Sequence, residues 1–96
     1  MSAQLRRYRI SAGNASLFAE EWRRGVLPLR RRYGFRVEAW LVDGTDEFVW
    51  LLRHDDRKSF DAADAAYYAS AERRSLEPDP ARLIEDTRHD WVTPVR

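Results

Sequence analysis

The stretch that decides the fold is Phe35–Asp55, with the sequence FRVEAWLVDGTDEFVWLLRHD. It reads as two apolar strands, over residues 35–42 and 47–54, joined by a turn at Asp43-Gly44-Thr45-Asp46. Both predicted strands carry apolar side chains on both faces. An antiparallel hairpin with one face in water alternates apolar and polar residues instead. We therefore expect both faces of this hairpin to be covered.

The register of the hairpin decides which face each tryptophan occupies, and the sequence leaves it open. Trp40 and Trp50 share a face only if the numbers of paired residues sum to an even value. Glu38 lies on the same side of its strand as Trp40. A buried Glu38 would need a basic partner, for which Arg53 and Arg6 are the candidates, and the alternative is a charge pair at a rim.

A strand and a helix are predicted before the hairpin. The strand runs over 4–11, where alternation places Tyr8 on an apolar face, and Asn14 is the predicted N-cap of the helix that follows. Apolar residues at helical spacing predict that this helix runs over 15–33. Pro28 lies inside it and lacks a backbone N–H, so we expect a kink there.

The end of this helix is marked by basic residues and a glycine. Arginines fill positions 30–32, in the last turn, where positive charge suits the helix dipole. We interpret them as a solvated helix end rather than as an anion site. Gly34 follows as the predicted left-handed residue that ends the helix.

A second helix and one more strand are predicted after the hairpin. The helix runs over 59–74, with a cap supplied by the aspartates at 55–56 or by Ser59. A short helical turn over 80–84 leads to a last strand over 87–93, predicted to lie at an edge or to reach a partner. The order strand-helix-strand-strand-helix-strand predicts an α+β, ferredoxin-like βαββαβ fold with a four-stranded antiparallel sheet.

The size and the cysteine count favour association. The 96 residues fit one domain, 1–96, and a domain this small has a thin core. Disulfides cannot reinforce it, because the chain has no cysteine, a composition that also suits a reducing cytoplasm. Two helices can cover only one face of the sheet. We therefore predict a homodimer in which a second copy covers the other face.

Charge and hydropathy exclude several classes of partner. Residues 1–34 hold eight arginines and two glutamates, whereas the remainder holds nine basic and fourteen acidic residues, so the net charge is only +1. Because the two halves partly cancel, we expect no nucleic-acid partner. No apolar run approaches the roughly 18 residues of a membrane span, and no signal peptide begins the chain, so we expect a cytoplasmic protein without a membrane partner.

The sequence also resembles the NIPSNAP family, within the dimeric α+β barrel superfamily. The resemblance is carried by LRRYRI at 5–10, EEWRRGVLPLRRRYGF at 20–35 and FVWLLRHDDRKSFDAADAAYYA at 48–69. It implies that two copies place their sheets face to face as a barrel, with the helices outside. The family brings no catalytic motif, so the resemblance assigns no residue a role.

The same superfamily includes small monooxygenases and haem-degrading enzymes. The resemblance implies that a haem-degrading member would carry an asparagine on its first strand and a histidine on a helix. Here the only asparagine is Asn14, at a turn, and neither histidine lies in a predicted helix. We therefore expect no haem cleavage and no cofactor.

Four aromatic residues on different elements are the candidate ligand-binding residues: Tyr8, Trp22, Trp50 and Tyr67. If they converge, they form an aromatic pocket between helices and sheet, with hydroxyl and indole groups that orient a ligand. The alternative is ordinary core packing.

His54 is the candidate catalytic residue, because histidine titrates near neutral pH and can act as a general base. The alternative is a strand-end histidine bonded to nearby backbone or carboxylate. His89 is interpreted as a surface residue, and two histidines so far apart predict no metal site.

Three functions remain open. The first is a small-molecule-binding protein of NIPSNAP type with a pocket between sheet and helices. The second is a cofactor-free monooxygenase or isomerase acting on a small aromatic or polyketide-like substrate, with Tyr8 or Tyr67 as proton donor. The third is an interaction module whose dimer is the function. A cavity with polar groups favours the first two, a perturbed histidine in it favours the enzyme, and a filled core favours the third.

Overall fold

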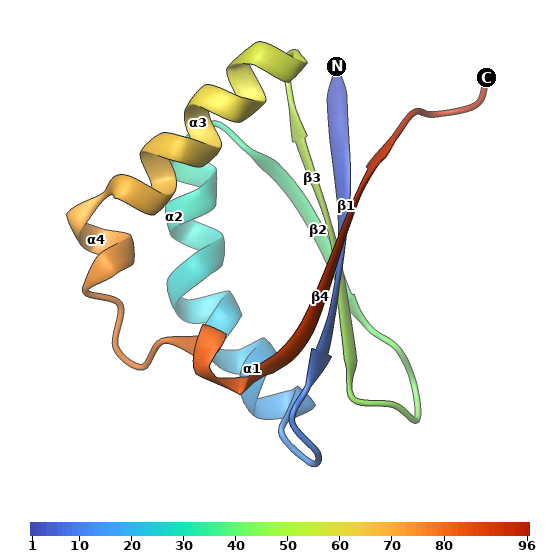
Figure 1. Ribbon diagram of the computed structural model, residues 1–96, viewed down its shortest axis with the longest axis vertical. Helices are drawn as coiled ribbons and strands as arrows, with labels where there is room; N and C mark the ends of the chain where they lie inside the picture. The colour runs from blue at the N-terminus through green and yellow to red at the C-terminus, as the bar shows by residue number, and fades with distance from the viewer.

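The computed structural model describes all 96 residues and has the predicted order of elements (Figure 1). The four strands form one antiparallel sheet in the order β2-β3-β1-β4. The α+β, ferredoxin-like prediction is therefore confirmed. The elements are β1 (Ser2–Ile10), α1 (Ala15–Glu21), η1 (Trp22–Val26), α2 (Leu27–Arg32), β2 (Arg36–Leu41), β3 (Glu47–His54), α3 (Arg57–Ala69), α4 (Ala71–Arg74), η2 (Pro80–Leu83) and β4 (Ile84–Val92).

The first helix is continuous from α1 to α2 and contains a π-helical turn, η1, which ends two residues before Pro28, the site of the predicted kink. Within it, the Leu27 N–H donates to the Trp22 carbonyl, five residues earlier. Pro28 follows directly and has no N–H for an ordinary helical hydrogen bond. The wider π turn therefore accommodates the proline without ending the helix.

The start of this helix has the predicted N-cap residue without the expected side-chain hydrogen bond. Asn14 occupies the N-cap position, but its side chain accepts no cap hydrogen bond. Its amide nitrogen instead donates to the Ser11 hydroxyl at 2.8 Å, which closes the turn after β1.

The second helix also differs, because it is divided at Ser70. Asp56 caps α3 by accepting from the Ser59 N–H at 2.7 Å, which settles which residue caps it. The backbone of Ser70 is extended, and its hydroxyl accepts from the Arg73 N–H at 3.1 Å, so Ser70 is the N-cap of the separate helix α4. A serine side chain that bonds a nearby backbone group in this way competes with the regular hydrogen bonds that would continue the helix.

The hairpin register places the two tryptophans on opposite faces. Ala39 pairs with Trp50, and Trp40 pairs with Val49. Trp50 therefore faces the helices, whereas Trp40 faces away from them. The last strand, β4, lies at the sheet edge as predicted, but it begins at Ile84 rather than at residue 87.

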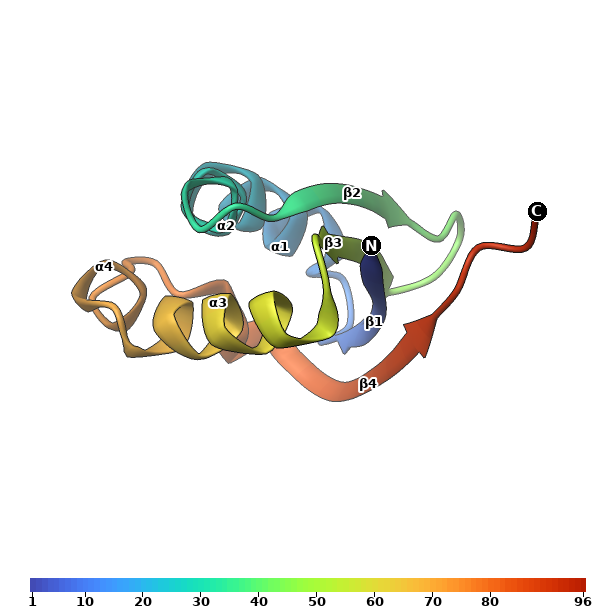
Figure 2. The same cartoon turned by 90° about the horizontal axis from the view of Figure 1, so that it is seen from above.

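Only one face of the sheet is covered by this chain. The helices all lie on one side (Figure 2), and the main apolar core lies between them and the sheet. On the other face, Trp40 is 50% exposed, and Val42 and Val92 are also exposed. The prediction that the hairpin's second face is covered is thus not met within one chain. No helix has the length and apolar character needed to cross a membrane.

Candidate functional site

A cavity of about 230 Å³ lies between the helices and the covered face of the sheet. All four predicted aromatic residues line it, although they come from β1, η1, β3 and α3. The full lining is Tyr8, Phe18, Trp22, Val26, Arg30, Trp50, Tyr67, Tyr68, Arg73, Pro80, Ala81, Ile84, Thr87 and His89.

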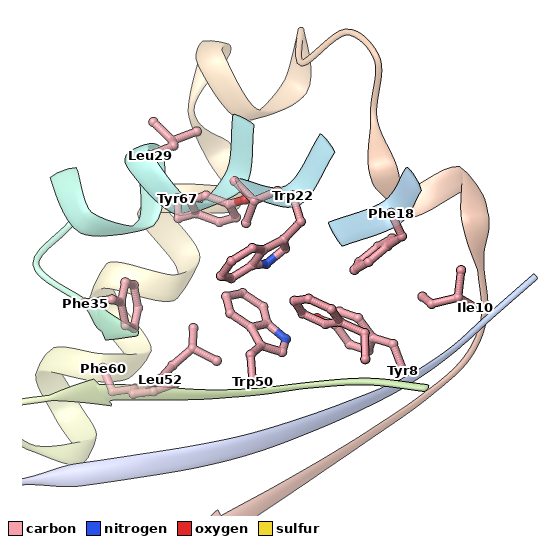
Figure 3. Packing of buried hydrophobic residues seen from close by; sticks show 12 residues of the cluster. Tyr8, Ile10, Phe18, Trp22, Leu29, Phe35, Trp50, Leu52, Phe60 and Tyr67 are labelled. Carbon is pink, nitrogen blue, oxygen red and sulfur yellow. The ribbon is translucent and has the colours of Figure 1, made fainter. Parts of the chain in front are cut away.

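The inner part of the cavity is aromatic. Figure 3 shows Trp22 reaching from the helix towards Trp50 on the sheet, and their ring centroids are 5.4 Å apart in an edge-to-face arrangement. Tyr8 lies 6.1 Å from Trp50, also edge to face. These side chains and Tyr67 are all buried. Rings that meet edge to face hold one another's orientation, so the walls of the cavity are well defined.

The outer part opens between α3, η2 and β4. Tyr68, Ala81, Thr87 and His89 line the cavity there and are exposed to solvent. The cavity therefore has a buried aromatic interior and a polar mouth.

A polar cluster that was not predicted from the sequence lies beside the aromatic interior. Its members are Gln4, Arg6, Arg30, Asp64 and Tyr68. Arg30 donates to Asp64 Oδ1 at 2.6 Å and to the Tyr68 hydroxyl at 3.2 Å. Arg6 donates to the same two oxygens, at 3.2 and 3.1 Å, and its Nε donates to the Gln4 side chain at 2.6 Å. Two guanidinium groups thus share one carboxylate.

Arg30 corrects the interpretation of residues 30–32 as a solvated helix end, because its side chain is completely buried. Two spacings could have indicated this cluster. Arg30 follows Trp22 and Val26 at intervals of four residues, which keeps it on the buried stripe of the helix. Arg6 lies on the same strand face as Tyr8, because side chains alternate along a strand. It is therefore not the partner of Glu38, which instead forms an ion pair with Arg53.

The protonation states of the cluster follow from burial and charge. Burial alone would lower the pKa of Arg6, but Tyr68, Tyr8 and Asp64 outweigh it and raise the pKa, so the guanidinium stays charged. Burial raises the pKa of Tyr8, although Arg6 opposes the shift, so its phenol stays protonated at neutral pH.

Four buried donors around the cavity have no hydrogen-bond partner within the chain. They are the indole nitrogens of Trp22 and Trp50 and the Nε atoms of Arg30 and Arg73, and all four residues line the cavity. Buried polar atoms nearly always have a partner, so four unpartnered donors at one cavity need an explanation.

Of the two histidines, His89 lies beside the cavity and His54 does not. His54 does not line the cavity; its Nε2 lies 3.3 Å from the Tyr33 carbonyl oxygen, and its ring meets Phe35 at 5.1 Å. His89 is exposed as predicted but lies at the cavity mouth, with its ring centroid 6.4 Å from that of Tyr8. Burial, followed by the charges of Arg6 and Arg30, lowers the pKa of His89 below its ordinary value. No three histidine, aspartate or glutamate side chains gather where they could hold a metal ion.

The comparisons with known proteins agree on the fold. No protein-family model and no curated protein matches the sequence. Among solved structures, a NIPSNAP domain protein from Burkholderia xenovorans superposes with a TM-score of 0.89 at 21% identity, covering 99% of this chain and 95% of the other. A NIPSNAP family protein of unknown function from Agrobacterium tumefaciens superposes with a TM-score of 0.91 at 16% identity, covering 100% and 89%.

A more distant structural likeness is to a protein named for an enzymatic activity. An antibiotic biosynthesis monooxygenase superposes with a TM-score of 0.73 at 14% identity, covering 100% of both chains. At such identities the likeness concerns the fold and not the chemistry. The predicted resemblance to the NIPSNAP family is therefore confirmed at the level of the fold.

Proposed function

We propose that the protein binds a small organic molecule in the cavity between its helices and sheet. The observation that carries the proposal is the convergence of Tyr8, Trp22, Trp50 and Tyr67, from four separate elements, around a space of about 230 Å³. An interaction module whose dimer is its function has no need of a recess lined by aromatic side chains from four separate elements. The recess therefore favours a binding protein over that alternative.

The size of the cavity limits the ligand. Its volume of about 230 Å³ is below the roughly 300–1,000 Å³ of typical ligand pockets. A molecule with one or two planar rings fits the space and the aromatic walls better than an extended polyketide.

We further propose that the binding protein is a homodimer joined through the uncovered face of the sheet. Trp40 and Val92 provide exposed apolar surface there, and the ion pairs Arg7–Glu47 and Arg53–Glu38 lie among them. The cavity lies on the opposite side of the sheet, so each subunit would keep its own cavity.

Two probes and one blocking substitution test the binding proposal. The probes are 2-naphthoate and 2-naphthamide, which share a two-ring body, and isothermal titration calorimetry measures their binding. The blocking variant is Thr87→Trp, because Thr87 is exposed at the cavity mouth and its replacement disturbs no buried side chain. We expect at least one probe to bind to the unmodified protein and to Thr87→Ala, the matched control, but not to Thr87→Trp. Absence of binding by both probes, or equal binding by all three proteins, would contradict the proposal.

A second candidate function, a cofactor-free monooxygenase or isomerase, is favoured by His89. Its lowered pKa keeps the imidazole neutral near pH 7, as a general base requires, and Tyr8 nearby keeps a protonated phenol that can donate. His89 would then have the role of general base that was predicted for His54. The role of His54 stays a prediction, and its position away from the cavity does not support it. Loss of turnover in His89→Gln, but not in the control His54→Gln, would support the assignment once a substrate is known. The reverse pattern would restore the role to His54.

A further inference from the structure

We infer that the cavity selects a planar organic carboxylate over neutral molecules of the same shape, and that Arg30 is the residue that sets this preference. The inference rests on the proposed binding function and names the chemical class of its ligand. Charge, hydrogen-bonding capacity and ring geometry each lead to it separately.

The buried charges of the polar cluster do not balance. The side chains of Arg6 and Arg30 are 2% and 0% exposed, and the only carboxylate that either contacts is Asp64. The cluster therefore holds one more positive than negative charge. A buried charge without a counter-charge is unfavourable, so the site gains most from a ligand with a single negative charge.

No other group at the cavity removes this surplus. Arg73 adds a positive charge, but Asp79 balances it through an ion pair at 3.2 Å. His89 is neutral near pH 7 because its pKa is lowered, and Tyr8 is neutral because its pKa is raised. The positive charge beside the cavity is thus not neutralised by any group of the chain.

The unpartnered polar atoms around the cavity are all hydrogen-bond donors. The four unpartnered buried atoms are indole and guanidinium nitrogens, and these groups donate but never accept. In addition, the Tyr68 oxygen accepts from both Arg6 and Arg30, which leaves its own proton free to be donated. A carboxylate accepts at two oxygens and donates nothing, so it matches the buried donors that surround the cavity.

The Arg30 guanidinium is held in one orientation by its neighbours. Its central carbon lies 3.8 Å from the centre of the Tyr67 ring and 5.4 Å from that of Trp50. Stacking of this kind holds the guanidinium plane, while its Nη atoms are fixed by Asp64 and Tyr68. The guanidinium is therefore held in place before a ligand arrives, next to aromatic walls that suit a flat molecule.

The test compares 2-naphthoate with 2-naphthamide, which differ in charge but hardly in shape. We expect the unmodified protein to bind the carboxylate at least about tenfold more tightly, the range expected of a hydrogen bond to a charged group. Equal or tighter binding of the amide would overturn the inference and leave the proposed binding function intact. If neither probe binds, both fail.

Two substitutions of opposite charge separate recognition from a merely structural role. Arg30→Gln leaves Arg6 balanced by Asp64, so the preference for the carboxylate should fall by about tenfold. Asp64→Asn leaves both guanidiniums unbalanced, so the preference should rise. A structural role alone would weaken both probes in both variants and leave the ratio unchanged, and that result would overturn the inference. If a variant fails to fold, the comparison of the two probes on the unmodified protein still tests the preference for the carboxylate.

Discussion

Trp50 is the residue through which the core and the cavity are joined. It is 2% exposed, packs against Tyr8 and Trp22, and has the guanidiniums of Arg6 and Arg30 over its ring at 5.6 and 5.4 Å. Its removal would therefore disturb both the apolar layer and the polar cluster.

We predict that Trp50→Ala lowers the free energy of unfolding by roughly 3–5 kcal/mol, because it leaves a large cavity in the core. Urea denaturation followed by circular dichroism measures the change. Trp50→Phe, which keeps an aromatic ring, should cost less and serves as the control. An unchanged denaturation midpoint in Trp50→Ala would show that the ring is not buried.

His89 provides a prediction about pH. Its pKa is lowered by burial and by Arg6 and Arg30, while Asp64 and Asp90 act in the opposite direction. The unfolded chain therefore takes up this proton at a higher pH than the folded chain does. The stability that neutral His89 contributes is fully present above the unfolded pKa of about 6.5 and is lost as the pH falls through the folded pKa.

An NMR titration of the His89 ring protons measures this shift. We expect a midpoint below about 6.5, and a higher midpoint in Arg30→Gln because one repelling cation is removed. A midpoint at or above the ordinary value in the unmodified protein would contradict the lowering of the His89 pKa by burial and by the two arginines.

At the residue scale, the sequence predicted the aromatic side chains of the cavity but not its arginines. Trp22 and Tyr67 lie on apolar helix stripes, and such stripes face the core in nearly every globular protein. Arginines are mostly exposed, so Arg6 and Arg30 were not expected in the core despite their positions on buried faces. Their burial depends on Asp64 and Tyr68, which lie far away in the sequence.

At the scale of elements, the end of α2 meets the end of β3 through Gly34. This residue has a φ of +89°, and a Cβ added to it would lie 3.0 Å from His54 Nε2. Glycine is therefore favoured at the turn from the helix into β2, because a side chain here would add strain.

We predict that Gly34→Ala destabilises the protein by about 1–2 kcal/mol, from the left-handed backbone and from the close approach to His54 together. Gly44→Ala is the matched control, because Gly44 has a φ of +75° but nothing near its added Cβ. Thermal unfolding should show a larger loss for Gly34→Ala than for Gly44→Ala. Equal losses would show that His54 does not restrict this turn.

The elements themselves were predictable from periodicity, whereas their boundaries were not. The division of the second helix at Ser70 depends on one hydroxyl that bonds the Arg73 N–H, which no periodic pattern reveals. The early start of β4 depends on the pairing of Ile84 with Ile10, a contact between distant parts of the chain. Both features depend on particular hydrogen bonds and pairings of the folded chain.

At the scale of the whole molecule, the two faces of the sheet differ completely. One face is covered by the helices (Figure 2) and borders the cavity. The other face exposes Trp40 and Val92. The two-sided apolar pattern of 35–42 and 47–54 anticipated this, because it required more covering than two helices supply. No part of this chain covers the second face, so the second copy stays a prediction.

Trp40→Glu tests whether that partner is a second copy. Trp40 is 50% exposed in a single chain, so the substitution should leave the folded monomer intact but place an unpaired charge in the proposed interface. Leu17→Glu is the matched control, because Leu17 is 45% exposed on α1, on the helical side of the molecule. We expect Trp40→Glu to abolish dimerisation and Leu17→Glu to leave it unchanged.

Sedimentation equilibrium of the unmodified protein, over a range of low concentrations, tests the central claim most directly. The claim is that this sheet needs a second copy on the face that its own helices leave bare. We predict a stable species of twice the 11.4 kDa chain mass. A folded, compact monomer that persists throughout the range would contradict it.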